Sequence, residues 1–492
     1  MANVAQSYIA IDLGATNGRV FAGRRSADIL ELSEVRRFPN SSVTLGGSTH
    51  WDVSRIWNEI RAALAEVSAS SLAGIGVDAW GVDYALLGKR GELLQNPYHY
   101  RDPRNVSAMS EVLQRISKEE IYRQTGVQFM AINTLYQLFA AKRDAPEVLA
   151  VGERLILIPD LFHYWMAGNA VCEYTVASTT QFASPVTRTW ASTLLEKLEL
   201  PAHLPGQLVE PGTIIGSLLP SVAGTAIAGV PVIAPASHDT ASAVAAVEAR
   251  GDTAFLSSGT WSLLGTELDA PIVSPRALQL NFTNEGGING TTRLLRNVMG
   301  LWMLECCRKQ WAAIGLKLNY EELVEAANAA PAFGALVDPD DPSFLNPVEM
   351  TLAIDNFCAR SDQPKPRGPE AYVRVILESL ALKYRITLRD LESITGQPVR
   401  RLRVIGGGSQ NRLLNQFTAN ATGRQVMAGP AEAAVLGNIG VQMLATGDVK
   451  SLREMRALID RSFGVETFEP QDTNHWDRQA ARFEHYCEYN FA

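Results

Sequence analysis

The chain has 492 residues, of which 46% are hydrophobic and 20% are charged, an ordinary composition for a globular protein. Its 52 acidic residues outnumber its 44 basic ones, and the net charge of −8 argues against nucleic acid or an anionic membrane as the main partner. The five cysteines show no CxxC spacing. We therefore expect neither a disulfide scaffold nor a structural zinc site, and we expect a reducing, cytoplasmic location.

The chain carries no pattern of a signal peptide or a membrane span. Its first residues lack a basic segment followed by an apolar stretch. The longest apolar stretch, residues 222–236, is interrupted by Gly, Pro and Thr and falls short of the ~20 residues that a spanning helix needs. The length alone suggests about three domains, or two large ones.

A β-hairpin is predicted in each half of the chain. The first spans residues 8–22 and turns at 14–18, where two glycines and an asparagine separate apolar runs. The second spans residues 253–265 and turns at 258–260. The two hairpins lie half a chain apart, which suggests an internal duplication.

A later strand in each half supports the same duplication. Residues 75–78 and 402–405 are apolar strands that run into glycine-bearing turns. Apolar residues with helical period follow Asp52, and a long helix starting near Ala371 ends at Gly396. The alternation of strands and helices predicts an α/β protein. We expect two domains, residues 1–245 and 246–492, the second ending in helices over 441–492.

The segment from Asp12 to Arg19 is a candidate phosphate site. A tight turn of small residues exposes backbone N–H groups, which suit phosphate oxygens, and Thr16 and Asn17 add side-chain donors. Asp12 at the strand end could hold Mg²⁺. An ordinary hairpin with a solvated aspartate is the alternative. The chain has no Walker A motif, so any nucleotide binds in another kind of fold.

Asp239 is a candidate general base. It follows an apolar strand and precedes a helix of small residues, a junction at which α/β folds place their ligands. An aspartate there can accept the proton of a hydroxyl that attacks phosphorus. Asp239 could equally be a helix N-cap. The neighbouring His238 could bind sugar hydroxyls with a neutral side chain, or serve only the structure.

Two further clusters have both a functional and a structural explanation. Asp78, Trp80 and Asp83 could form a carbohydrate site, or Trp80 could simply pack in the core. The triple glycine 406–408, between a strand and a helix, favours close approach of a nucleotide, with a plain flexible turn as the alternative. A small-residue helix is predicted to begin within 431–440.

These motifs, in this order, resemble the FGGY carbohydrate kinases of the actin-like sugar kinase superfamily. The resemblance covers roughly residues 8–445, and its most specific parts are NTLYQL, TNEGG and NVMGLW. The segments that carry it are 77–87, 100–104, 126–138, 236–244, 256–265, 282–287, 296–302 and 405–416.

The resemblance implies a fold and an activity. The fold would be two actin-like (ribonuclease H-like) domains, each a five-stranded mixed sheet flanked by helices, with a catalytic cleft between them. The activity would be transfer of the γ-phosphoryl group of ATP, with Mg²⁺, to the 1-hydroxyl of L-rhamnulose in L-rhamnose catabolism. The partners would be a small ketose and ATP, with no nucleic acid or membrane, and the protein would be a monomer or homodimer.

The resemblance also implies residue roles. Asp239 would be the catalytic base, and Asp12 would lie near Mg²⁺. Sugar contacts would come from Gly81, His238, Asp239, Thr240 and Asn297. Nucleotide contacts would come from Ala15, Thr16, Asn17, Gly18, Arg19, Thr260, Glu305 and Gly407. Glu305 departs from the glutamine that is usual in such kinases, and a carboxylate near polyphosphate would be repelled unless a cation screens it.

Two alternatives remain at this point. One is an FGGY kinase for another ketose, such as L-fuculose or xylulose. The other is an actin-like ATP-binding protein that is not a kinase. An activity assay separates them, because only a kinase would consume ATP in response to a ketose.

Overall fold

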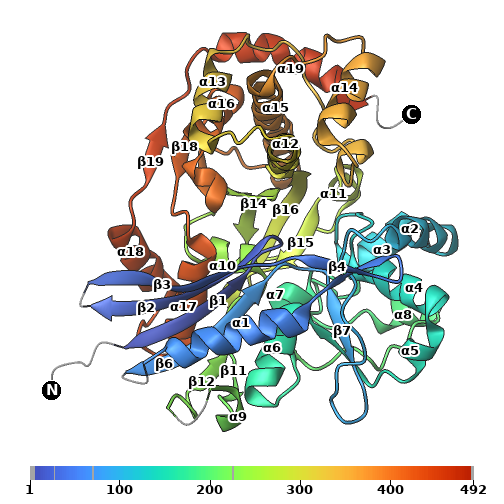
Figure 1. Ribbon diagram of the computed structural model, residues 1–492, viewed down its shortest axis with the longest axis vertical. Helices are drawn as coiled ribbons and strands as arrows, with labels where there is room; N and C mark the ends of the chain where they lie inside the picture. Colours follow the sequence, from blue (N-terminus) through green and yellow to red (C-terminus); the bar gives the residue numbers. More distant parts are fainter. Residues whose placement is uncertain (1–5, 27, 69–70, 224–225, 489–492) are drawn as a thin grey trace. The chain divides into compact units, whose positions relative to one another are not determined.

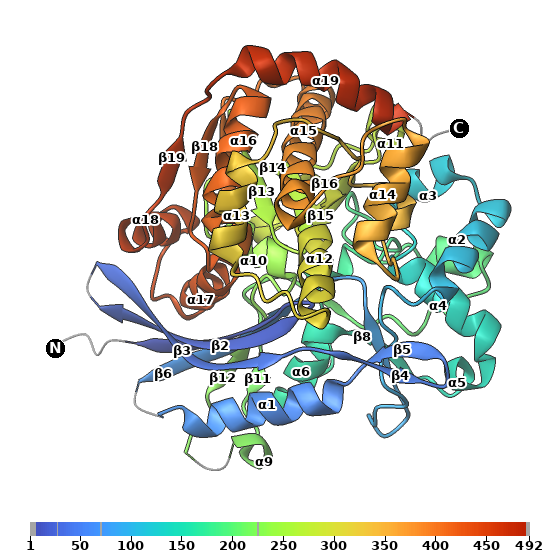
Figure 2. The same cartoon turned by 45° about the horizontal axis from the view of Figure 1, so that its top comes forward.

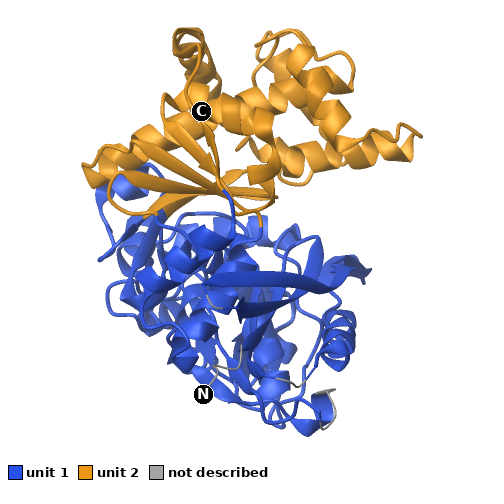
Figure 3. Cartoon of the chain, turned by 90° about the vertical axis from the view of Figure 1, so that its left-hand side faces the viewer, with its two compact units in different colours: residues 1–248, 267–294, 432–464 blue, residues 249–266, 295–431, 465–492 orange. Residues whose placement is uncertain are grey.

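The computed structural model describes residues 6–26, 28–68, 71–223 and 226–488 (Figure 1). The chain divides into two compact units, which Figure 3 shows in different colours. Unit 1 consists of residues 1–248, 267–294 and 432–464, and unit 2 consists of residues 249–266, 295–431 and 465–492. Each unit is thus assembled from three separate stretches of sequence.

Unit 1 contains a six-stranded mixed sheet in the order β11-β12-β6-β1-β2-β3. Strand β1 pairs antiparallel with β2 and parallel with β6, which confirms the first predicted hairpin and the strand predicted at 75–78. The bounds of the strands are β1 (Ser7–Leu13), β2 (Asn17–Ser26), β3 (Ile29–Pro39), β6 (Leu72–Ala79), β11 (Ile214–Ser217) and β12 (Pro231–Ile233).

The two faces of this sheet differ because side chains alternate along each strand. On one face Ile9, Ile11 and Leu13 of β1 join the core formed with helices α1 (Val53–Glu66) and α6 (Ile158–Ala167). On the other face β6 presents Gly74, Gly76 and Asp78 to helix α17 (Ala433–Thr446). Figure 2 shows α1 and α17 on opposite sides of the sheet.

Unit 2 holds most of a seven-stranded sheet in the order β15-β16-β14-β13-β17-β18-β19. Strand β13 pairs antiparallel with β14 and parallel with β17, which confirms the second hairpin and the strand predicted at 402–405. The bounds of the strands are β13 (Thr253–Ser258), β14 (Trp261–Leu268), β15 (Thr283–Gly286), β16 (Thr292–Met299), β17 (Arg401–Ile405), β18 (Gln425–Ala428) and β19 (Glu466–Phe468).

The two sheets share a five-stranded plan, as expected, but each has additional strands. The order β3-β2-β1-β6-β12 of the first sheet corresponds to β16-β14-β13-β17-β18 of the second. Short strands β11 and β19 extend these orders by pairing antiparallel with β12 and β18, and β15 lies beyond β16. The expected count of five strands per sheet is therefore too low, because edge strands of three or four residues carry no readable period.

Local signals define the helices well. Asp52 caps α1 through a hydrogen bond from Arg55 N to its side chain (3.0 Å). The long helix α15 (Pro369–Thr395) ends at Gly396 in the left-handed conformation, as predicted. It packs against α13 (Tyr320–Ala329) and α16 (Arg412–Thr422) in unit 2 (Figure 2). Within the described ranges, no helix combines the length and apolar character needed to cross a membrane.

The remaining elements complete the two units. The short strands are β4 (Ser42–Leu45), β5 (Ser48–Trp51), β7 (Tyr84–Leu87), β8 (Arg154–Leu157), β9 (Cys172–Glu173) and β10 (Leu208–Val209). The other α-helices of unit 1 are α2 (Arg104–Arg115), α3 (Lys118–Thr125), α4 (Thr134–Asp144), α5 (Pro146–Ala150), α7 (Tyr174–Ala177), α8 (Ser192–Lys197), α9 (Pro220–Ala223), α10 (Asp239–Ala245), α11 (Pro275–Gln279) and α18 (Leu452–Ser462). Those of unit 2 are α12 (Trp302–Ala313), α14 (Met350–Arg360) and α19 (Thr473–Glu488).

Candidate active site

The turn of the β1–β2 hairpin is held at its base by backbone bonds. Gly14 N donates to Asn17 O (2.9 Å), and Asn40 donates through its side chain to Gly14 O (2.8 Å) and through its backbone to Thr16 O (3.0 Å). Among the described residues, none is assigned as acceptor to the N–H groups of Ala15 and Thr16. The turn therefore keeps backbone donors available for an anion.

Asp12 closes β1, opposite Arg19 in the register of the hairpin. The guanidinium of Arg19 bonds both the Asp12 carboxylate and the carboxylate of Glu432, which precedes α17. Burial lowers the pKa of Arg19, but these two acids raise it overall above its usual range. Arg19, predicted to contact nucleotide, is thus engaged in two ion pairs within unit 1.

Asp78 lies beside Asp12, because the two residues are partners in the parallel β1–β6 register. It is fully buried, and Asn438 of α17 donates to its Oδ2 (2.6 Å). Gln442 in turn donates to Asn438 Oδ1 (2.7 Å) and to Ile9 O (2.9 Å). Burial, with a further contribution from the Asp12 charge, raises the pKa of Asp78 well above its usual range. Helix α17 thus bonds to both strands, at Ile9 of β1 and at Asp78 of β6.

The segment before α10 is fixed by backbone and side-chain bonds. Ala79 N, at the end of β6, donates to Ser237 O (2.9 Å), while Ser237 N donates to the buried carboxylate of Glu173 (3.0 Å). His238 N donates to the hydroxyl of Thr175 (3.1 Å). These bonds set the start of α10 next to the end of β6. Asp239 is the first residue of α10 and follows β12, which is the strand-to-helix junction that the sequence predicts.

The carboxylate of Asp239 has one crowded oxygen. Its Oδ1 accepts from Thr240 N (2.5 Å) and from the Thr240 hydroxyl (3.1 Å), and it lies 3.4 Å from His238 Nε2. Within the described residues, no donor is assigned to Oδ2. The side chain is 31% exposed, and burial, more than any neighbouring charge, raises its pKa. An accessible carboxylate with a raised pKa is suited to act as a general base.

Helices α10 and α17 approach so closely that the crossing requires glycine. A Cβ atom at Gly437 would lie 1.7 Å from the carbonyl oxygen of Ser242. Ser242 belongs to α10, whose first residue is Asp239. The position of the candidate base is therefore coupled to the packing of α17.

The cluster after β6 serves packing. Trp80 is buried, and Asp83 accepts from the indoles of Trp51 (2.6 Å) and Trp80 (2.9 Å) and from Gln137 (2.8 Å). With these donors the Asp83 carboxylate is satisfied inside the protein. Of the two explanations offered by the sequence, core packing is therefore favoured over a carbohydrate platform for Trp80 and Asp83. Gly81, between them, is only half-buried.

In unit 2, Thr260 lies in the turn after β13, and the triple glycine follows the neighbouring strand β17. The carbonyl of Thr260 accepts from Gly300 N (3.2 Å) and Trp302 N (3.3 Å), which joins the hairpin tip to the start of α12. A Cβ at position 406 or 408 would lie 3.0 Å or less from Ser258, whereas a Cβ at 407 would meet nothing within 4 Å. Two of the three glycines are thus required by packing, and Gly407 is exposed.

Asn297 and Glu305 lie in different elements of unit 2. Asn297 is half-buried in β16, where its neighbours are fixed by Asp340, which accepts from Met299 N (3.0 Å) and pairs with Arg296 (3.3 Å). Glu305 lies in α12 and pairs with Arg308 (3.0 Å) and, more loosely, with Lys309 (3.9 Å). Two cations therefore already offset the charge at the position that departs from glutamine.

The predicted residues divide between the units. Unit 1 contains Asp12, the 15–19 turn, Gly81 and the segment 238–240, whereas unit 2 contains Thr260, Asn297, Glu305 and Gly407.

Several buried or half-buried polar residues hold these side chains or their neighbours in place, and the sequence alone predicts no role for them. They are Glu173, Glu285, Arg293, Glu432, Asn438 and Gln442.

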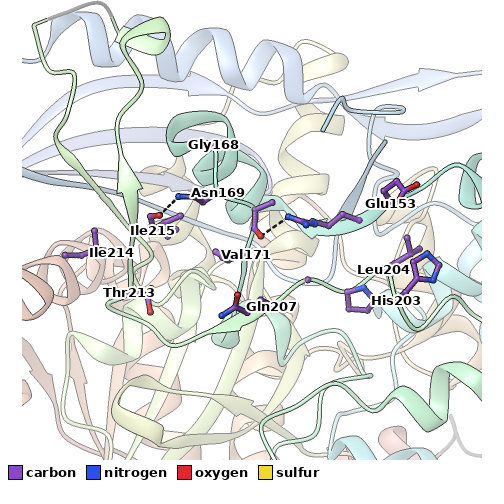
Figure 4. Close-up of a pocket in the computed structure, with 14 residues that line it drawn as sticks. Glu153, Gly168, Asn169, Val171, His203, Leu204, Gln207, Thr213, Ile214 and Ile215 are labelled. Atoms are coloured by element: carbon purple, nitrogen blue, oxygen red, sulfur yellow. Dashed lines mark hydrogen bonds between the residues drawn. The ribbon is translucent and has the colours of Figure 1, made fainter. Parts of the chain in front are cut away.

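A separate pocket of unit 1 contains none of the predicted residues. It measures about 670 Å³ and is lined mainly by backbone and polar side chains, including Asn169, His203 and Gln207 (Figure 4). Arg154, at its edge, donates to Ala170 O (3.1 Å). No candidate chemistry converges on this pocket, and the catalytic hypothesis rests on the ends of β1 and β6 and the start of α10.

Comparison with known families matches nearly the whole chain. Residues 7–246 match the N-terminal domain, and residues 254–446 the C-terminal domain, of the FGGY family of carbohydrate kinases. A rhamnulokinase of Bacteroides thetaiotaomicron is 44% identical over 482 residues, covering 97% of this chain and 99% of that protein. A rhamnulokinase of Pectobacterium atrosepticum is 41% identical over 487 residues, covering 96% of each.

Solved structures show the same fold at low sequence identity. Gluconate kinase from Lactobacillus acidophilus superimposes with a TM-score of 0.78 at 18% identity, covering 99% of this chain and 97% of that one. Glycerol kinase from Plasmodium falciparum, solved with ADP, gives a TM-score of 0.75 at 15% identity, covering 99% of each chain.

Proposed function

Because this chain belongs to the FGGY family of carbohydrate kinases, we propose that it transfers the γ-phosphoryl group of ATP to the 1-hydroxyl of L-rhamnulose. The substrate is supported by the relatives at 40–44% identity, which are named rhamnulokinases. The chemistry is supported by one observation above all, the Asp239 carboxylate, whose Oδ1 is occupied by internal donors.

Asp239 is the general base of the proposed reaction. Its Oδ2 takes the proton of the 1-hydroxyl as that oxygen forms its bond to the γ-phosphorus. The bond from phosphorus to the oxygen bridging to the β-phosphate breaks, and ADP leaves with the electron pair. Since the transition state is stabilised mainly by positioning and electrostatics, one base and a set of phosphate donors suffice.

The β1–β2 turn is the proposed phosphate cradle in unit 1. The backbone N–H groups of Ala15 and Thr16 are its donors, and the Asn17 side chain, which donates to the Thr16 hydroxyl (3.3 Å), can turn toward a phosphate instead. Thr260 and Gly407 are the proposed nucleotide contacts in unit 2, together with Glu305, and Asn297 the proposed sugar contact there.

The residues at the strand ends fit Mg²⁺. Asp12 supplies a carboxylate, and Asp78 beside it has an oxygen, Oδ1, without a partner in the described part of the chain. No group of three or more His, Cys, Asp and Glu side chains among the described residues could hold a metal alone. That suits Mg²⁺, which commonly takes one or two carboxylates together with substrate phosphates. When bound, the ion neutralises charge on the phosphates.

A cytoplasmic location belongs to the same proposal. It is supported by the five cysteines, all of which are free thiols, as expected where ATP and reduced glutathione are present.

The proposal is tested by ATP consumption with a panel of ketoses. L-Rhamnulose should give the highest kcat/KM, ahead of L-fuculose and xylulose, and the product should carry phosphate on O1. Asp239→Asn should lower kcat by about 10²- to 10⁴-fold while ATP still binds. Asp28→Asn is the matched control, since Asp28 is exposed in the turn between β2 and β3.

Two results would overturn parts of the proposal. Near-normal turnover by Asp239→Asn would exclude Asp239 as the base. A higher kcat/KM for another ketose would keep the kinase and the base but reassign the substrate.

A further inference from the structure

A buried arginine contacts the ring of His238. Arg293, at the start of β16, is 0% exposed. Its Nε donates to Gly286 O (2.8 Å), and one terminal nitrogen lies 3.1 Å from Glu285 Oε2 and 3.1 Å from His238 Nδ1. All of these residues belong to unit 1. An uncharged ring nitrogen is an unusual partner for a fully buried guanidinium, which ordinarily pairs with carboxylates.

The direction of the hydrogen bond follows from the chemistry of the two groups. A guanidinium carries only donors, so it can bond a ring nitrogen only where that nitrogen has a lone pair. With Nδ1 as the acceptor, the imidazole of His238 is neutral and its proton is on Nε2. Nε2 lies 3.4 Å from Asp239 Oδ1, so the remaining N–H is directed at the candidate base.

The position of Glu285 would favour the other tautomer of His238, with the proton on Nδ1. Its Oε2 lies 3.4 Å from His238 Nδ1 and would favour a proton there. The distance from Nδ1 to Arg293 is shorter, and the Glu285 charge is already offset by the same guanidinium. Burial raises the pKa of Glu285, but its neighbours, including the charge of Arg293, lower it overall. A neutral ring with its proton on Nδ1 would also turn the Nε2 lone pair toward the Asp239 carboxylate, which is repulsive.

We propose that Arg293 is a positioning residue that holds His238 neutral with its proton on Nε2. This N–H is then a third donor near Asp239 Oδ1, beside the two from Thr240, and it leaves Oδ2 for the sugar hydroxyl. An imidazolium at His238 would instead stabilise the ionised carboxylate and weaken Asp239 as a base. The part of this inference that concerns catalysis rests on the proposed function, whereas the tautomer of His238 does not.

The tautomer is measured directly in the resting protein. The chain has seven histidines, and in a sample labelled with ¹⁵N-histidine the His238 signals are those that a His238→Gln variant lacks. Near neutral pH we expect an unprotonated Nδ1 and a protonated Nε2. A protonated Nδ1, in either the neutral or the charged ring, would overturn the inference. Substrate identity has no influence on this result, so it stands or falls separately from the kinase assignment.

Kinetics of matched variants test the consequence for catalysis. Arg293→Met should lower kcat by about 10- to 100-fold, by analogy with the loss of a group that orients a metal-binding histidine. It should change the KM for ATP little and redistribute the His238 tautomers. Glu285→Gln keeps an acceptor for Arg293 and should keep both the tautomer and most of kcat. Arg293→Lys, which retains a donor, should restore part of the activity.

Controls separate positioning from loss of folding. Arg456 is also buried and bonds a buried glutamate, Glu267 (2.8 Å), on another part of unit 1. Arg456→Met should lower the melting temperature without changing the His238 signals. If Arg293→Met does not fold, the double variant Arg293→Met, Glu285→Gln removes both buried charges together. Unchanged tautomer and kcat in a folded variant without Arg293 would overturn the proposal.

Discussion

The two oxygens of the Asp239 carboxylate have different surroundings. Oδ1 accepts hydrogen bonds from the backbone N–H and the hydroxyl of Thr240 and lies near His238. No donor to Oδ2 is found within the described residues. A carboxylate with both oxygens satisfied would be a poor base, and one without donors would be protonated in a buried site. In the uneven arrangement the Thr240 donors oppose the effect of burial on the pKa, and Oδ2 is left available to accept a proton.

Thr240→Val tests this balance. Burial raises the pKa of Asp239, and the hydroxyl of Thr240 lowers it, so removal of the hydroxyl raises the pKa further. Because the base must be ionised, the acidic limb of kcat should move to higher pH. On that limb we expect about a 2- to 10-fold lower kcat, as for the loss of one hydrogen bond. Thr240→Ser keeps the hydroxyl, so the acidic limb of its kcat profile should stay at the wild-type pH. If the acidic limb of Thr240→Val also stayed there, Asp239 would not be the group that sets it.

Asp83 gives a prediction on stability. Its amide counterpart cannot accept from Trp51, Trp80 and Gln137 together, so above pH 7, where the carboxylate is ionised, Asp83→Asn should cost about 1–3 kcal/mol. Burial raises the pKa of Asp83 to about 7, although these donors lower it.

The pH dependence of that cost has a definite sign. The unfolded chain loses the proton near pH 4 and the folded chain near 7, so wild-type stability falls as pH rises between these values. The Asp83→Asn variant has no ionisable group at this position, so its stability does not fall for this reason as the pH rises. Melting temperatures should therefore differ most near pH 4 and least above pH 7, and a difference that grows with pH would show the sign to be wrong.

The sequence predicts those candidate site residues whose signal is local. Asp12 and Asp239 each follow an apolar strand and precede small residues, so both the strand end and the ligand-binding junction are visible in the order of residues. Arg293 and Asn438 were not assigned because their partners are remote, 55 positions away at His238 and 360 at Asp78. A lone arginine or asparagine between apolar residues carries no sign of such a pairing.

At the scale of elements, helix α17 connects the strands of unit 1 to the start of α10. Glycines at positions 74 and 76 of β6 bring its polar residues Asn438 and Gln442 against the sheet. Glu432, the residue before its first turn, pairs with Arg19. The helix therefore fixes the ends of β1 and β6 and the first residues of α10 relative to one another.

Gly437→Ala tests that connection. The added Cβ would lie 1.7 Å from a backbone oxygen of α10, so the helices must separate at a cost of about 1–3 kcal/mol or more. We expect a lower melting temperature and a lower kcat, because Asp239 moves with α10. The matched control is Gly440→Ala in the same helix, where the added atom would meet the flexible side chain of Met455. Equal effects of the two variants would contradict this account.

Helices and strands could be predicted from the sequence where the spacing of apolar residues and the residues at the turns or caps indicate the same element. The two hairpins, the helix capped by Asp52 and the helix ended by Gly396 all satisfy this condition. The edge strands β11 and β19 do not, because three or four residues cannot display an alternation, and they form by pairing with a neighbouring strand. The strands and the helix against which α17 packs could not be predicted either, because a helix of small residues can pack against many surfaces.

At the scale of the molecule, the units do not follow the order of the chain. Unit 1 needs residues 432–464, which come long after its first 248 residues. The family models meet between residues 246 and 254, near a single point in the sequence, whereas the compact units are interleaved.

A fragment of residues 1–248 should therefore fail to form a stable unit. It lacks α17, so the face of β6 that carries Gly74 and Gly76 and the buried Asp78 would be exposed to water. We expect poor solubility, binding of a hydrophobic dye and no cooperative thermal transition. Joining residues 267–294 and 432–464 to this fragment through flexible linkers should restore a transition. A cooperative melt of the fragment alone would contradict the prediction.

The late position of α17 has a consequence for biosynthesis. Ribosomes add about 5–20 residues per second, so the 198 residues between position 248 and the end of α17 at 446 take about 10–40 s to make. During that time the strands that present Asp12 and Asp78 exist without the helix that covers them. The covered arrangement of Asp12 and Asp78 therefore forms only as translation nears its end.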